Sequence, residues 1–331
     1  MGERFKAFVI EEADGRPRGA FKDLTLADLP DRDVLVEVAF STVNYKDGLA
    51  VTGKGRIARR LPMVAGVDLA GTIVESRSPD WRAGERVVVN GWSLSETAWG
   101  GYARYQRVEP GWLTRLPDAF SLEEAMAIGT AGYTAALCAD ALEQWGVIQQ
   151  AGREVLVTGA SGGVGSIAVA LLAKAGCRVA AATGRPATHD YLRRLGAESL
   201  VDRAALQEKG RPLQPERWGG AVDSVGGPIL ANVLSQTVYG GAVAACGLAG
   251  SAELPGSVLP FILRSVALIG VESSSPPQAR RDAAWARLAR DLDPAKLRRM
   301  YEVRPFAELP EVAAAVLANQ IRGRIVLSMA S

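Results

Sequence analysis

Residues 156–176 read LVTGASGGVGSIAVALLAKAG, and this stretch decides the fold. An apolar segment leads into a run of glycines, and a second apolar segment follows the run. Two motifs overlap in it: Gly159 to Gly163 fits the G-x-S-x-G turn of hydrolases, and Ala160 to Gly165 fits a variant of the dinucleotide-binding turn. The first question is whether Ser161 attacks a substrate or whether the turn binds a pyrophosphate.

A hydrolase would need a histidine base for Ser161. The chain has a single histidine, His189. In hydrolases with this turn the acid precedes the histidine, whereas the candidate acids Asp202 and Asp223 follow it. The sequence therefore disfavours a serine nucleophile.

A dinucleotide site fits the surroundings better, because the glycines stand between a predicted strand and a predicted helix. The absence of side chains lets a pyrophosphate approach the backbone and lets the helix pack on the strand. The helix N-terminus adds unpaired N–H groups and about half a positive charge. We therefore predict cofactor contacts at Ser161, Gly162, Gly163, Val164 and Gly165.

Length and charge narrow the range of partners. A chain of 331 residues exceeds what one hydrophobic core usually serves, so about two domains are expected. The 38 basic and 36 acidic residues leave a net charge of +2, which disfavours nucleic acid and anionic membranes as partners. The chain begins without an apolar leader, and its three cysteines are too scattered for a disulfide framework. We expect a cytoplasmic protein with a small-molecule partner.

The periodicity of apolar residues changes along the chain. The first third has β-branched residues at a period near two, as in residues 33–44, which indicates half-buried strands. After about residue 125, short strands that are apolar throughout alternate with helices, as in a parallel sheet buried on both faces. We predict an α/β fold with a doubly wound Rossmann sheet and a β-rich domain. The expected division is 1–124, 125–271 and 272–331, and the last part returns to the first domain.

The end of the second Rossmann strand predicts which dinucleotide binds. An NAD site would place Asp or Glu there to accept both ribose hydroxyls. This chain has Thr183, Gly184 and Arg185, and a guanidinium pairs well with a 2′-phosphate. Arg203, after the third strand, is a candidate for the adenine or its phosphate. NADPH is therefore the expected cofactor; the alternative is that Arg185 is a solvated surface residue.

The sequence contains few residues that could bind a zinc ion. Many two-domain dehydrogenases use zinc, held by Cys, His and carboxylate ligands, to polarise an alcohol oxygen. One histidine and three scattered cysteines do not provide that set. We expect no metal, and hydride transfer to a carbon that is already electron-poor.

Six stretches resemble the zinc-independent medium-chain dehydrogenase/reductase superfamily, and within it the NADPH-dependent acryloyl-CoA reductase and quinone-oxidoreductase-like group. They are VNYKDGLAVTGKGRI, LPMVAGVDLAGT, GTAGYTAA, LVTGASGGVGS, YGGAVAACGLAG and LANQIRGR. The resemblance implies a GroES-like domain made from both chain ends, a Rossmann domain between them, a cleft at their junction and a homodimer. In zinc-using members Cys stands near Asn44 and His-Glu near Gly66–Asp68, and here Val67 cannot bind a metal.

The chemistry implied by the resemblance is hydride delivery from NADPH to the β-carbon of a conjugated thioester, with protonation at the α-carbon. Hydrogen-bond donors directed at the thioester oxygen would lower the activation barrier for hydride transfer. Our candidates are Asn44 as amide donor, Tyr45 as proton donor or relay with a cofactor contact, and Asp47 as the group that orients them. The alternative is that the segment is only a corner in which Asp47 bonds backbone N–H groups.

The resemblance also implies further ligand contacts. Thr130 and Tyr133 resemble residues that line the nicotinamide, although Tyr133 fits helix packing equally well. Asn319 resembles a tail residue that reaches the same ring, and Leu248 stands where the ribose would meet backbone. A basic segment is a candidate for the phosphates of coenzyme A, or else a solvated loop. Its cations are Lys54, Arg56, Arg59 and Arg60.

Three functions remain open at this point. The first is an NADPH-dependent reductase of an α,β-unsaturated acyl-CoA, with acryloyl-CoA converted to propanoyl-CoA. The second is a quinone or enone reductase on the same scaffold, whose turnover would not need the CoA part. The third is a redox-inactive NADPH-binding sensor. Fold alone does not separate these, because one scaffold hosts many chemistries.

Overall fold

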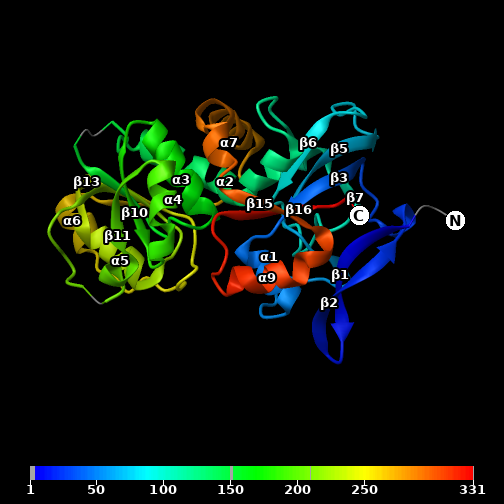
Figure 1. Cartoon of the computed structure of the whole chain (residues 1–331), viewed down its shortest axis with the longest axis horizontal. Helices are drawn as coiled ribbons and strands as arrows, with labels where there is room; N and C mark the ends of the chain where they lie inside the picture. Colours follow the sequence, from blue (N-terminus) through cyan, green and yellow to red (C-terminus); the bar gives the residue numbers. More distant parts are fainter. Residues whose placement is uncertain (1–3, 150–151, 209, 331) are drawn as a thin grey trace. The chain divides into compact units, whose positions relative to one another are not determined.

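The computed structural model describes residues 4–149, 152–208 and 210–330. Contacts divide the chain into two compact units (Figure 1). Unit 1 comprises Met1–Thr130, Ser274–Ala283 and Tyr301–Ser331, and unit 2 comprises Ala131–Ser273 and Ala284–Met300. Two helices, α2 (Leu122–Gln144) and α7 (Gln278–Asp291), contain residues of both units.

Unit 2 contains the predicted Rossmann sheet. Its described strands are all parallel and lie in the order β11-β10-β9-β12-β13-β14. The strands are β9 (Glu154–Val157), β10 (Arg178–Thr183), β11 (Ala197–Asp202), β12 (Trp218–Asp223), β13 (Thr237–Ala245) and β14 (Ala267–Gly270). The direction of strand addition reverses between β9 and β12, and such a switch point is where ligands bind in these sheets.

Helices connect most successive strands of this sheet. They are α3 (Gly163–Lys174), α4 (His189–Leu195), α5 (Gly227–Gln236) and α6 (Leu259–Arg264), and α8 (Pro294–Leu297) follows α7. Every residue of β12 is buried, as both-face coverage requires. A core of aliphatic side chains around Trp218 fills the space between sheet and helices. The expectation of a doubly wound sheet is confirmed.

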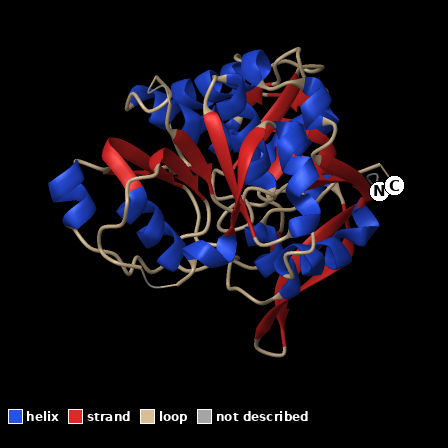
Figure 2. Cartoon of the chain, turned by 60° about the vertical axis from the view of Figure 1, so that its left-hand side comes forward, coloured by secondary structure: helices blue, strands red, loops and turns tan. Residues whose placement is uncertain are grey.

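Unit 1 is rich in antiparallel strands. Figure 2 shows the strands of the chain in red. Its larger sheet has the order β15-β16-β3-β5-β6-β8, with β7 beside β3, and the smaller one has the order β2-β1-β4. The bounds are β1 (Phe5–Ala13), β2 (Arg16–Leu24), β3 (Val34–Thr42), β4 (Met63–Val64), β5 (Asp68–Ser76), β6 (Arg86–Asn90), β7 (Tyr105–Val108), β8 (Thr114–Arg115), β15 (Tyr301–Pro305) and β16 (Arg324–Ser328). Because β16 pairs with β3, segments from both ends of the chain contribute to this unit.

Two local features of unit 1 follow directly from sequence. The β1–β2 hairpin turns at Asp14 and Gly15, which have φ of 54° and 71°, the left-handed conformation that Asp-Gly favours in tight hairpins. Helix α1 (Tyr45–Thr52) packs beside α9 (Leu309–Leu317) (Figure 1). Gly48 permits this approach, because a Cβ there would lie 3.0 Å from the Leu317 side chain.

Helix α2 is long and apolar enough to cross a membrane by length and composition. It is the one such helix in the described ranges, and 89% of its most apolar window is buried inside the structure. Burial of that kind is typical of the core helix of a folded protein. At Gly129 the backbone leaves the helical region, with φ of 50° and ψ of −164°. At this kink the N–H of Thr130 leaves the helical hydrogen-bond pattern and donates to the side chain of Asp68.

Candidate functional site

The parallel sheet of unit 2 places the sequence-predicted cofactor residues along one edge. Strand β9 ends before the glycine turn, defined as Gly159–Gly163, and β10 ends before Gly184 and Arg185. Strand β11 ends before Arg203, and β13 ends shortly before Leu248, which is 61% exposed. Since the carboxyl ends of parallel strands share one edge, the structure brings these positions together.

The glycine turn is held in shape by its own backbone. Gly159 has φ of 57°, and its carbonyl accepts a 2.9 Å hydrogen bond from the N–H of Gly162. A Cβ at Gly165 would lie 2.4 Å from that same carbonyl, so only glycine fits there. Helix α3 begins directly after Gly162, and no side chain caps it. Its first N–H groups therefore point to a site that suits an anion.

Two arginines border the turn. The Nη2 of Arg185 donates a 2.8 Å hydrogen bond to Oγ of Ser161, a residue of the glycine turn. The hydroxyls of Thr183 and Thr188 bond the N–H and the carbonyl of Arg185, which fixes the backbone that carries the guanidinium. A Cβ at Gly184 would lie 3.1 Å from the guanidinium of Arg203, and no ion pair of Arg203 is seen among the described residues. One cationic side chain thus contacts the turn, and a second lies beside Gly184.

In unit 1 the segment Asn44–Asp47 forms the start of α1. The carboxylate of Asp47 accepts hydrogen bonds from the N–H of Asn44 at 2.9 Å and from the N–H of Val67 at 3.0 Å. Asn44 Nδ2 lies 3.1 Å from Asp47 Oδ2 and 2.7 Å from Asp68 Oδ2. Both amide hydrogens of Asn44 therefore have carboxylate acceptors inside the protein.

Asp68 and Arg324 complete a buried network that we call the polar corner, made of Asn44, Asp47, Asp68 and Arg324. Asp68 also accepts bonds from Asn90 Nδ2 at 2.6 Å and from the N–H and hydroxyl of Thr130 at 3.0 and 2.5 Å. Arg324 donates to Asn44 Oδ1 at 2.8 Å and to the Thr42 hydroxyl at 2.9 Å. A Cβ at Gly129 would lie 2.5 Å from Nη2 of this guanidinium, so glycine is required at the kink in α2.

Burial dominates the electrostatics of the polar corner. It raises the pKa of Asp47 to about 7, and the nearby Asp68 adds to this shift, although hydrogen bonds from Asn44 and Val67 oppose it. Burial lowers the pKa of Arg324, and the Asp68 and Asp47 carboxyls work against that shift. Burial therefore favours the protonated form of the Asp47 carboxyl.

Tyr45 is the catalytic candidate that faces solvent. It is the first residue of α1, is 46% exposed, and its hydroxyl has no hydrogen-bond partner in the described structure. Asn44 and Asp47, by contrast, bond to protein groups. The observed Asp47 bonds to backbone N–H groups also match the alternative of a plain structural corner.

The other residues that the resemblance implies as ligand contacts lie in different environments. Thr130 is engaged with Asp68, and Tyr133 is completely buried in α2, as helix packing requires. Asn319 follows α9 with φ of 55°, a position where Asn ends helices. In the basic segment, Arg59 contacts Glu96 at 3.6 Å. The other three cations are exposed and have no ion pair within the described part of the chain: Lys54, Arg56 and Arg60.

Sequence reasoning missed Asp68, Asn90 and Arg324 as members of the network. A signal was present for two of them. Asp68 stands in the apolar run VAGVDLAG and Arg324 in GRIVL, and a charge within a buried strand needs a partner. Asn90 follows an apolar run at a strand end and carries no such signal.

The residues present do not fit a zinc site. Val67 has no ligand atom, and the Asp68 carboxylate is already used by Asn44, Asn90 and Thr130. No group of three or more His, Cys, Asp or Glu side chains in the described structure could hold a metal ion.

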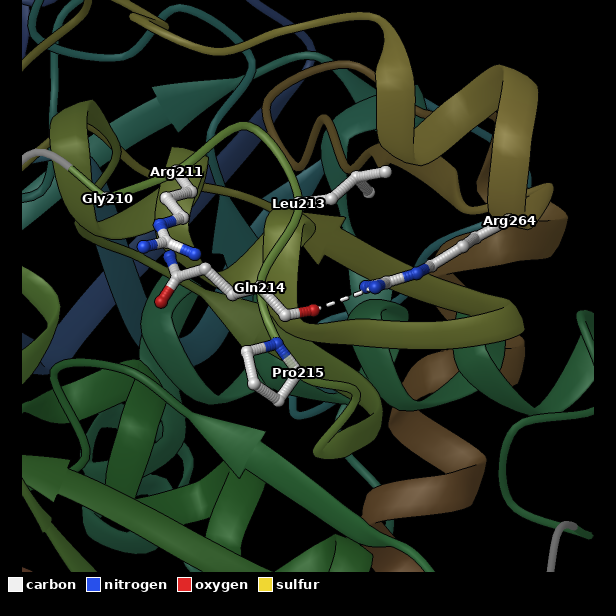
Figure 3. A pocket seen from close by; sticks show the side chains of 6 residues that line it. All are labelled: Gly210, Arg211, Leu213, Gln214, Pro215 and Arg264. Carbon is white, nitrogen blue, oxygen red and sulfur yellow. Dashed lines mark hydrogen bonds between the residues drawn. The ribbon is translucent and has the colours of Figure 1, made fainter.

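A cavity of about 600 Å³ opens elsewhere in unit 2 (Figure 3). Its lining is Gly210, Arg211, Leu213, Gln214, Pro215 and Arg264. Gln214 precedes β12 and Arg264 precedes β14, so the cavity lies at the amino-terminal edge of the sheet. Arg264 already donates to the carbonyls of Gln214 at 2.7 Å and Ser235 at 2.8 Å. This cavity is therefore separate from the glycine turn.

Comparisons with known proteins agree with both units. The GroES-like domain of alcohol dehydrogenases matches residues 30–118, and the zinc-binding dehydrogenase family matches residues 163–290. Acrylyl-CoA reductase AcuI of Ruegeria pomeroyi is 47% identical over 98% of this chain and 99% of its own length. The chain belongs to the medium-chain dehydrogenase/reductase superfamily.

Two solved members of the superfamily are similar over the full length. The yhdH oxidoreductase of Salmonella enterica in complex with NADP is 48% identical, with a TM-score of 0.94 over 98% of this chain and 99% of that one. The Bacillus subtilis protein yhfP with NAD bound is 41% identical, with a TM-score of 0.95 over 99% and 100%. That Bacillus subtilis protein bears the name "Putative quinone oxidoreductase YhfP".

Proposed function

We propose that this protein is an NADPH-dependent reductase that converts acryloyl-CoA, or a closely related α,β-unsaturated acyl-CoA, to its saturated thioester. The observation that carries the proposal is the glycine turn with Arg185 fixed over Ser161, in a chain that aligns throughout with an acrylyl-CoA reductase. Similarity to a solved NADP complex supports the cofactor.

The residues at the sheet edge fit NADPH. The glycine turn leaves room and N–H groups for the pyrophosphate, and the Arg185 guanidinium, which follows β10, would supply a bidentate donor to a 2′-phosphate. No carboxylate occupies residues 183–185, so the diol of NAD lacks its usual acceptor there. When bound, NADPH supplies a hydride to the β-carbon of the conjugated thioester.

The polar corner is proposed to position Tyr45 for this reaction. Asp47 and Asp68 hold Asn44, and Asn44 begins the helix whose first residue is Tyr45. The exposed Tyr45 hydroxyl would donate a hydrogen bond to the thioester oxygen or deliver the proton to the α-carbon. Asn44 then acts by orientation, because its amide hydrogens already have acceptors.

The test follows NADPH absorbance with acryloyl-CoA, crotonyl-CoA and a small quinone in parallel, with NADH as the cofactor control. We expect acryloyl-CoA to give the highest kcat/KM and NADH to be at least about tenfold poorer than NADPH. No oxidation with any acceptor, despite tight NADPH binding, would favour the sensor. Equal rates with NADH would contradict the role of Arg185.

A quinone reductase is the second candidate, favoured by the 43% identity with yhfP over 331 residues. The two functions differ in their need for the basic segment. Replacing Lys54, Arg56 and Arg60 together by Gln should raise KM for acryloyl-CoA severalfold if these cations meet the phosphates of coenzyme A, and should leave a quinone unaffected. Arg59→Gln is the matched control, because Arg59 is already paired with Glu96.

We also propose a homodimer formed through unit 2. Strand β14 ends the order of the parallel sheet, so one of its edges has no neighbour in the described chain. The preceding α6 exposes Ile262 by 67% and Leu263 by 58%. A second copy would cover both the strand edge and these apolar side chains. Light scattering should report a dimer, and Ile262→Lys with Leu263→Lys should convert it to monomer.

A cytoplasmic location is part of the same proposal. The three cysteines, Cys138, Cys177 and Cys246, are free thiols in the structure. Thiols of this kind are typical of reducing compartments. Cell fractionation that placed the protein outside the cytoplasm would contradict it.

A further inference from the structure

A buried carboxylate is bonded to the residue that precedes the glycine turn, and none of its hydrogen bonds in the described structure involves a residue predicted to meet the cofactor. Asp223 is the last residue of β12, at the switch point beside β9, and is completely buried. Its Oδ1 accepts a 2.6 Å hydrogen bond from the Thr158 hydroxyl, and its Oδ2 accepts one of 2.8 Å from the N–H of Gly226. A carboxylate taken out of water persists only with such donors.

Thr158 connects Asp223 to the glycine turn. It stands between the end of β9 and Gly159, and its N–H donates to the Val222 carbonyl at 3.0 Å. Its hydroxyl also accepts from the N–H of Ser224 at 3.2 Å, and its carbonyl accepts from the Ser224 hydroxyl at 3.3 Å. The residue that precedes the turn is therefore fixed through all of its polar groups.

The same segment also supports the loop that follows β13. The N–H of Cys246 donates to the Asp223 carbonyl at 2.8 Å, and the N–H of Gly250 donates to the Val225 carbonyl at 2.8 Å. Leu248, the expected ribose contact, lies in this loop. Residues 223–226 thus hold both loops that are expected to bind the cofactor, one on each side of the switch point.

We propose that Asp223 and Thr158 are positioning residues for the nucleotide cofactor. Their side-chain bond fixes the glycine turn relative to the loop 246–250, so that the N–H groups for the pyrophosphate and the backbone for the ribose are placed before binding. Neither residue needs to touch the cofactor. The inference rests on the proposed function, because it assumes that NADPH binds at this edge.

The test measures NADPH binding directly, by calorimetric titration of the unliganded protein. Thr158→Val removes the hydroxyl and keeps the shape, and we expect Kd for NADPH to rise about tenfold, the loss of one buried hydrogen bond to a charged acceptor. At saturating NADPH, kcat should stay within about twofold of wild type. Thr158→Ser retains the hydroxyl and should restore the wild-type Kd.

Thr237→Val is the matched control. Thr237 is also completely buried, and its hydroxyl donates to the Val233 carbonyl at 2.8 Å, but it lies at the amino end of β13. It should lower thermal stability about as much as Thr158→Val and leave Kd unchanged. If Thr158→Val does not fold, Asp223→Asn serves in the same titration and should also raise Kd.

Three results would overturn the inference. The first is a wild-type Kd for NADPH in Thr158→Val, or in Asp223→Asn if Thr158→Val does not fold. The second is a rise of Kd in Thr237→Val as large as in Thr158→Val. The third is a Kd in Thr158→Ser that stays raised. A wild-type protein that binds no NADPH would instead contradict the proposed function itself, so the two failures are distinguishable.

Discussion

The polar corner of unit 1 and the glycine turn of unit 2 both gather polar groups, but they satisfy them differently. In the corner, carboxylates, amides and a guanidinium bond one another within the protein. At the turn, the first N–H groups of α3 have no side-chain cap, and Arg203 has no ion pair among the residues described. A network whose polar groups all have partners within the protein serves as a scaffold. Polar groups that lack such partners are suited to binding a ligand.

The largest expected effect comes from breaking the corner at its cation. Arg324→Met would leave Asn44 Oδ1 without its buried donor and would remove the buried positive charge near Asp68, and we expect unfolding free energy to fall by about 3–5 kcal/mol. Urea denaturation measures this, with the exposed Arg322→Met as control. A loss below about 1 kcal/mol would show that the corner is not an interdependent network.

The pH dependence of stability tests the same corner through Asp47. Its pKa is 3.8 ordinarily and about 7 when folded, so the folded state retains a proton that the unfolded state releases in this window. Unfolding free energy should therefore fall as pH rises from 5 to 7, by up to about 1.4 kcal/mol per unit, and this contribution should level off above 7. Burial raises the pKa of Asp223 in the same direction.

Urea titrations of wild type and Asp47→Asn across pH 5 to 8 separate the two carboxyls. The variant should show a flatter dependence because the largest contributor is gone. A wild type that gains stability between pH 5 and 7, or a variant with an unchanged slope, would contradict the buried, proton-retaining state of Asp47.

Tyr45→Phe tests whether the corner presents a catalytic group. We expect kcat with acryloyl-CoA to fall about 100-fold, as for loss of a positioned proton donor, with Kd for NADPH unchanged. Stopped-flow measurement at saturating NADPH gives the chemical step. Unchanged turnover would remove Tyr45 from the mechanism and leave the corner as structure alone.

Arg185→Ala tests the incomplete site at the turn. Loss of a charge-assisted donor should raise the Kd for NADPH about tenfold and leave the Kd for NADH nearly unchanged, because only NADPH carries the 2′-phosphate. Arg178→Ala is the control, since Arg178 begins the same strand and pairs with Glu198. An equal loss for both cofactors would assign Arg185 a structural role.

Much of the fold could be predicted because local patterns coincide with it. The apolar strand, glycine run and helix at 154–174 fix one βα unit, and the later apolar runs repeat it. The partners of Asp68 could not be predicted, because Asn44, Asn90 and Thr130 come from three distant segments. Local propensity carries no information on which side chains meet across a sheet or at a helix kink.

The candidate site likewise has a part that could be predicted from sequence and a part that could not. The glycine turn was predictable because its chemistry lies in consecutive residues, and the Thr183–Arg185 segment follows from the next strand end. The Thr158–Asp223 bond joins residues 65 positions apart, across the switch point, and depends on strand order. Positions that are adjacent only through topology become visible only in the structure.

A crystal structure of the protein with NADPH tests the central claim most directly. The account predicts the pyrophosphate against the first N–H groups of α3 and the 2′-phosphate on the Arg185 guanidinium. A cofactor bound elsewhere while the glycine turn stays empty, or a carboxylate in place of Arg185 at the ribose, would contradict it.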